Sequence, residues 1–143
     1  MQRFVTKVIP WSVALLTLVG TAFGQTASEL VDHSGLRGGV IFLPRSSDEG
    51  MTLEFARRAG FVVYAQVADE TGVQRLRAKA AESGLLAKTL YAGVGSADHL
   101  PLAERAASLV LIADLSSSDL TESNRSVWLR ARVPRRGVAI FGR

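Results

Sequence analysis

The chain has 143 residues, of which 48% are hydrophobic, and this size fits one globular domain with little room for a second. It contains no Cys, which excludes disulfides, thiolate metal sites and a cysteine nucleophile. The formal net charge is +4, but two of the 17 basic residues and none of the 13 acidic ones precede residue 25. The remainder therefore carries a net charge of only +2, and we expect no nucleic-acid partner.

The first 24 residues have the organisation of a cleavable signal peptide. Arg3 and Lys7 form a basic start, an apolar run follows at 8–19, and the small residues Ala22 and Gly24 precede the expected cleavage point. The apolar run has about 12 residues, whereas a membrane-spanning helix needs roughly 20. We therefore expect an exported protein, periplasmic or extracellular, without a stable membrane anchor after cleavage. A retained anchor and a buried N-terminal helix are the alternatives.

Downstream of this segment, helical and strand-like patterns alternate. In chain order we expect a helix at 26–33, a strand at 39–43, a helix at 48–59, a strand at 61–67, a helix at 70–83, strands at 88–94 and 108–113, a helix at 121–132 and a strand at 137–141. Strands separated by helices favour parallel pairing with right-handed crossovers. The sequence therefore predicts an α/β fold, a doubly wound, mainly parallel five-stranded sheet with helices on both faces.

Ligands of such sheets bind at the carboxyl ends of the strands, which directs attention to the loops that follow them. Asp114 closes the strand at 108–113 and is the candidate catalytic residue, although it could instead anchor the polar loop at 116–119. His33 and His99 have no companion at metal-ligand spacing, so we expect no metal site. Arg75, Arg77 and Lys79 are interpreted as a solvated helix face.

Three stretches together resemble class I S-adenosylmethionine-dependent methyltransferases of the type 11-like group. They are Gly-Gly-Val-Ile-Phe-Leu at 38–43, a Leu-Pro step at 100–101 before the strand that ends at Asp114, and a helix, turn and strand at 130–140. The resemblance covers residues 28–142 and implies a Rossmann-like fold for a domain at 25–143, with S-adenosylmethionine as the cofactor if there is one. It extends to the methyltransferase-like part found at the N-terminus of exported pyrroloquinoline-quinone-type β-propeller proteins.

The residues that would bind this cofactor are largely replaced. The glycine-rich turn of the family corresponds here to residues 44–50, where only Gly50 remains and bulkier side chains would crowd the ligand. The acid that holds the ribose hydroxyls corresponds to Val67, or to Gln66 with a one-residue slip. Asp69 could substitute for that acid, or it could cap the helix that begins at Glu70.

The adenine side of the site is altered in the same way. The family often carries a Gly-Asp pair before the Leu-Pro step, whereas this chain has Ser96 in the Asp place and Asp98 two residues later. The resemblance thus gives Gly50, Asp69, Ser96 and Asp98 as the candidate cofactor contacts.

These replacements favour a pseudoenzyme, a methyltransferase-like scaffold or docking domain of an exported protein. The alternative is an active S-adenosylmethionine-dependent methyltransferase acting on a small molecule. A third possibility, a binder of another periplasmic ligand, would call for a polar cluster at the strand ends that the sequence does not present. The family's sheet ends in an antiparallel hairpin that is missing after residue 141, so either the domain is truncated or a further domain or protein docks at the uncovered edge.

Overall fold

The structure is a computed structural model that describes residues 26–96, 99, 101–103, 105–112, 122–131 and 137–141. The residues expected to form the signal peptide lie outside these ranges, as do Asp98 and Asp114. No helix in the described part of the chain is long and apolar enough to cross a membrane.

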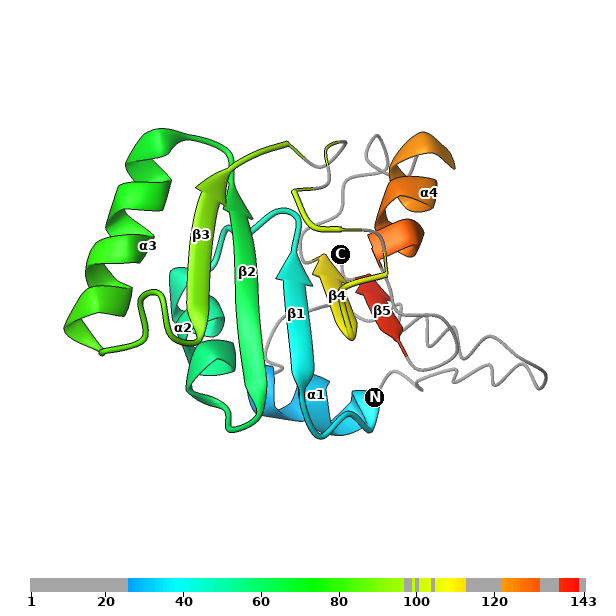
Figure 1. Cartoon of the computed structure of the whole chain (residues 1–143), viewed down its shortest axis with the longest axis horizontal. Coiled ribbons are helices and arrows are strands. Elements are labelled where there is room, and N and C mark those ends of the chain that lie inside the picture. Colours follow the sequence, from blue (N-terminus) through cyan, green and yellow to red (C-terminus); the bar gives the residue numbers. More distant parts are fainter. Residues whose placement is uncertain are drawn as a thin grey trace, which may run out of the picture.

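Among the described residues, five parallel strands form one sheet in the order β3-β2-β1-β4-β5 (Figure 1). The strands are β1 Gly39–Leu43, β2 Phe61–Val67, β3 Leu90–Val94, β4 Leu109–Ile112 and β5 Val138–Phe141. The first strand is central, so the chain moves outward through β2 and β3 and then returns to the other side of β1. This confirms the predicted doubly wound sheet and places the switch point between β1 and β4.

In the part of the chain that the structure describes, four helices connect or precede the strands: α1 Ala27–Ser34, α2 Glu49–Arg57, α3 Glu70–Glu82 and α4 Glu122–Ala131. Helix α1 begins with a capping box between Thr26 and Glu29 and ends at Gly35, which has a left-handed φ of 71°. Asp48 and Asp69 cap α2 and α3, because each side chain accepts a hydrogen bond from a first-turn backbone N–H.

Two predicted boundaries differ from the structure by two residues, and the others agree to within one residue. Helix α2 ends at Arg57 rather than at residue 59, because Arg58 adopts an extended backbone and its N–H bonds to Phe55 O. Strand β3 begins at Leu90 rather than at residue 88, because residues 85–89 form a turn around the carbonyl of Leu85. Both differences arise from local hydrogen bonds that apolar periodicity does not report.

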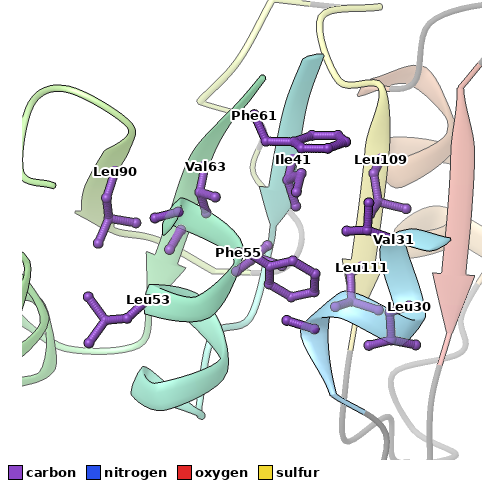
Figure 2. Packing of buried hydrophobic residues seen from close by; sticks show 14 of the residues in the cluster. Leu30, Val31, Ile41, Leu53, Phe55, Phe61, Val63, Leu90, Leu109 and Leu111 are labelled. Atoms are coloured by element: carbon purple, nitrogen blue, oxygen red, sulfur yellow. The ribbon is translucent and has the colours of Figure 1, made fainter. Parts of the chain in front are cut away.

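Alternating strand residues face two separate cores. The larger core joins the sheet to α1, α2 and α3, and Figure 2 shows its members Leu30 and Val31 of α1, Phe55 of α2, and Leu109 and Leu111 of β4. The smaller core lies on the opposite face, where α4 and the segment before β4 pack against strand residues that include Phe42, Val110 and Ile112. Helices therefore cover both faces, and all four residues of β4 are buried, as its apolar sequence predicts, whereas Val62 of β2 is exposed.

Candidate functional site

The turn that follows β1 lies at the carboxyl edge of the sheet and is bonded to the end of β2. The backbone N–H of Ser46 donates to the carbonyl of Gln66 over 2.8 Å. The Thr52 hydroxyl donates to Asp48 O at 2.8 Å, so Ser46 Oγ, 2.7 Å away, is the donor in its contact with Thr52 Oγ1. The polar groups of Ser46 and Thr52 thus bond to protein partners.

A small hollow remains beside this turn, lined by side chains that include Arg45, Met51, Phe55 and Leu111. Its volume is about 20 Å³, enough for one or two water molecules. Ligand pockets for molecules of cofactor size usually enclose at least about 300 Å³. This hollow by itself is therefore too small to hold a nucleoside cofactor.

Gln66 connects the ends of the first three strands. It is almost fully buried, its backbone carbonyl accepts from Ser46, and its Nε2 donates to His99 O over 3.1 Å. A Cβ on Gly95 would lie 2.2 Å from Gln66 Nε2, so glycine is needed for this close approach. The Oε1 atom is also buried and has no hydrogen-bond partner within the described part of the chain.

From the sequence, Gln66 is expected only as a second position for the ribose acid. Its part in joining three loops depends on tertiary contacts with residues 46, 95 and 99. One signal in the sequence points to it, because a long polar side chain interrupts an otherwise apolar strand, and a buried polar group needs partners.

Val67 and Asp69 occupy the positions where a ribose contact is expected. Val67 packs against the larger core, and its Cγ1 would lie 2.5 Å from a Cβ on Gly72. The Asp69 side chain accepts a 2.7 Å hydrogen bond from Gly72 N at the start of α3. The contact predicted by the capping interpretation is therefore present at Asp69.

Gly50 and Ser96 lie at different parts of the carboxyl edge. Gly50 is exposed in the first turn of α2, where an added Cβ would approach Asp48 Oδ1 to 3.3 Å. Ser96 is exposed two residues after β3. The other two candidates, Asp98 and Asp114, fall outside the described residues.

Removing the Asp69 cap provides a test of its structural role. We expect Asp69→Ala to lower the free energy of unfolding by about 1 kcal/mol, because α3 loses the acceptor for Gly72 N. Asp69→Asn keeps a side-chain acceptor and should cost only a few tenths of that amount. Urea unfolding followed by circular dichroism measures both, and equal losses in the two variants would contradict the cap as the source of the effect.

Four carboxylates near the carboxyl edge each contact a group of this chain. Asp48 accepts from Met51 N, Asp69 from Gly72 N and Glu70 from Gln74 Nε2. Glu49 forms ion pairs with Lys79 and with Arg75, whose Nε lies 3.2 Å away. These ion pairs link the start of α2 to α3. Among the residues that the structure describes, no group of three or more His, Asp or Glu side chains could hold a metal ion.

The ion pair of Glu49 makes a small pH-dependent contribution to stability. The hydrogen bond from Lys79, with the charges of Lys79 and Arg75, holds the pKa of Glu49 below its ordinary value. A lowered carboxyl pKa stabilises the fold above the ordinary value, and this contribution is lost as the pH falls through the lowered pKa. We expect Glu49→Gln to lower the free energy of unfolding at pH 7 by less than about 1 kcal/mol, since the pair is at the surface.

Urea titrations of wild type and Glu49→Gln between pH 7 and pH 3 test this expectation. The difference between the two proteins should shrink toward acid pH, and Lys79→Met should reduce the same pH dependence. A difference that stays constant across the range would assign the effect to something other than the charge of Glu49.

Comparisons with known proteins identify the fold. No protein-family model matches the sequence, and no curated protein matches it. Solved structures do match, and three of them show the range of sequence identity, TM-score and coverage. A Methanococcus maripaludis protein assigned as an S-adenosyl-L-methionine-dependent methyltransferase is 16% identical with a TM-score of 0.67, over 81% of this chain and 53% of that one.

A methyltransferase from Aquifex aeolicus, dependent on S-adenosylmethionine, is 21% identical with a TM-score of 0.63, over 80% of this chain and 62% of that one. The [4+2]-cyclase SpnF is 20% identical with a TM-score of 0.65, over 80% of this chain and 42% of that one. This chain thus spans about half the length of such structures, and identities this low establish a methyltransferase-like fold alone.

Proposed function

We propose that this chain is a non-catalytic module with the fold of class I methyltransferases, carried by an exported protein, whose S-adenosylmethionine site has been lost. The observation that carries the proposal is the β1 turn bonded to the end of β2 through Ser46 N and Gln66 O. In the glycine-rich turns to which residues 44–50 correspond, bare backbone must approach the ligand closely. Here Arg45 and Ser46 line a hollow with room for only one or two waters.

The remaining role of such a module is to act as a scaffold. Its two cores are intact, whereas at the carboxyl edge Gln66 bonds to Ser46 and to His99. Strand β5 lies at one edge of the described sheet, and an apolar edge strand is normally paired or covered in a folded protein. We infer that a further domain or protein docks at this edge.

One observation favours the alternative function, an active methyltransferase acting on a small molecule. Gln66 Oε1 is a buried acceptor at the carboxyl edge with no partner among the described residues, and a ligand hydroxyl or amino group would satisfy it. A buried water would satisfy Gln66 Oε1 equally well. This atom therefore supports an active enzyme less strongly than the filled β1 turn supports a non-catalytic module.

Calorimetry of the purified chain with S-adenosylmethionine and S-adenosylhomocysteine separates the two functions. The non-catalytic module should give no binding heat at millimolar ligand, whereas a dissociation constant in the micromolar range would contradict it. The matched variant is Val67→Asp, which restores a carboxylate at the position that corresponds to the ribose acid. Binding by this variant alone would support both the alignment and the loss of the site.

Export is tested by a different measurement. We expect a secretion-competent bacterium that expresses the full chain to release a product whose N-terminal residue is Gln25. N-terminal sequencing of the exported fraction identifies the cleavage point. A full-length product that stays in the cytoplasm would contradict this part of the proposal and leave the calorimetric test unaffected.

A further inference from the structure

Strand β3 forms the other edge of the described sheet, and three of its residues direct their backbone groups outward. Thr89 O accepts from Val63 N, and Gly95 N donates to Val67 O, so the odd-numbered residues between them face β2. In a parallel pair the alternate residues face away, and here these are Leu90, Ala92 and Val94. Their N–H and C=O groups are the ones that an added strand would use.

Two of these three residues already bond within the chain. The N–H of Leu90 donates to Leu85 O, and its carbonyl accepts from Ala87 N, so the turn at 85–89 closes the start of the edge. The carbonyl of Ala92 accepts two hydrogen bonds from Arg77 of α3, from Nε at 3.2 Å and from a terminal guanidinium nitrogen at 2.8 Å. Arg77 thus lies across the middle of the edge.

The side chains of this edge favour strand pairing. Tyr91 is 43% exposed and Val94 is 52% exposed, and both are residue types enriched in strands. An apolar edge without charge or cover readily pairs with another copy of the same strand. The guanidinium is the charged group that the described residues place directly on the outward backbone of β3.

We propose that Arg77 blocks strand addition at the β3 edge and so prevents a second copy of this chain from pairing with β3. An incoming strand would have to displace the guanidinium from Ala92 O, which costs two charge-assisted hydrogen bonds. It would also have to bury the displaced cation or force it aside. This role is independent of the function proposed for the carboxyl edge.

The test compares Arg77→Met with Arg75→Met. Methionine keeps an apolar stem but removes the donors, and Arg75 lies on the same helix with its side chain 66% exposed and bonded to Glu49 instead. Sedimentation velocity over a concentration series measures self-association, and hydrogen exchange of the Ala92 and Val94 amides locates it. Circular dichroism verifies that each variant is folded.

We expect Arg77→Met to self-associate with a dissociation constant at least about tenfold lower than that of wild type, because a backbone acceptor is freed for an intermolecular hydrogen bond. The amides of Ala92 and Val94 should gain protection as the concentration rises, and Arg75→Met should behave like wild type. Equal association of all three proteins, or association without protection of these amides, would overturn the proposal.

Arg77→Lys provides the second variant if Arg77→Met does not fold. Lysine keeps the positive charge but cannot present the two parallel donors of the guanidinium fork. We expect its self-association to be stronger than that of wild type, with the same gain in amide protection. If a folded Arg77→Lys protein associates no more strongly than wild type, Arg77 does not block strand addition at β3.

Discussion

Replacement of Phe55 by alanine should lower the free energy of unfolding by about 4 kcal/mol. Phe55 projects from α2 into the larger core and has no exposed surface (Figure 2). The variant loses the burial of an aromatic ring and leaves a cavity that the strands on one side and α2 on the other cannot fully close. Urea unfolding followed by circular dichroism or tryptophan fluorescence gives the change directly.

A conservative replacement shows whether the loss comes from core volume. Phe55→Leu keeps most of the apolar surface and should cost about 1 kcal/mol. The partly exposed Tyr91 provides a surface comparison, since Tyr91→Ala removes a ring of similar size from the sheet edge. A loss for Phe55→Ala no larger than that for Tyr91→Ala would mean that α2 does not pack against the sheet as described.

Replacement of Gly39 by alanine should cost about 3 kcal/mol. Gly39 begins β1 with a φ of 127°, a conformation that side chains strongly disfavour. A Cβ at this position would also lie 2.0 Å from Ser108 Oγ and 2.7 Å from Ser108 Cβ, distances far inside van der Waals contact. Rotation of the serine moves its hydroxyl but not its Cβ, so the backbone at the start of β1 must shift.

Two further variants distinguish the cost of the strained φ angle from the cost of the steric overlap with Ser108. Gly35→Ala places a side chain at a φ of 71° with no atom within 4 Å, so it should cost only about 1 kcal/mol of backbone strain. Ser108→Gly in the Gly39→Ala background removes the overlapping atoms and should recover about half of the loss. If the double variant is as unstable as Gly39→Ala, the overlap with Ser108 is not a source of the cost.

The sheet could be predicted from the sequence because its inner strands are mostly apolar segments separated by helical patterns. Continuous apolar runs at 39–43 and 61–67 give β1 and β2 with the predicted boundaries. The capping residues Thr26, Asp48 and Asp69 also lie where the sequence places the helix starts. These features depend on local periodicity and local hydrogen bonds, both of which can be predicted from a short window of residues.

Contacts between distant segments could not be predicted in this way. The sequence predicts that Arg77 belongs to a solvated helix face, whereas in the structure its guanidinium donates two hydrogen bonds to Ala92 O. Arg75 and Lys79 are exposed as expected, yet both pair with Glu49 of α2. A helical pattern indicates which residues share a face, but it does not indicate which partner from another element lies opposite that face.

The candidate site was predicted in part. The crowding of the turn at 44–50 is expected from its composition, and the hollow beside Arg45 has a volume of about 20 Å³. The bond between Ser46 and Gln66 was not predicted, because a turn that is not glycine-rich could equally have been displaced away from β2. For Asp69 the sequence left two roles open, and the cap contact with Gly72 N is present.

The central claim is that the cofactor site has been lost, and the backbone amide of Ser46 tests it most directly. In the proposed module this amide donates a hydrogen bond to Gln66 O. Nuclear magnetic resonance of the purified chain, with and without millimolar S-adenosylhomocysteine, reports both the hydrogen-exchange rate and the chemical shift of this amide. We predict that the Ser46 amide exchanges slowly and that neither quantity changes when the nucleoside is added. Fast exchange in the free protein, or a saturable shift of Ser46 and its neighbours in the turn, would contradict the loss of the cofactor site.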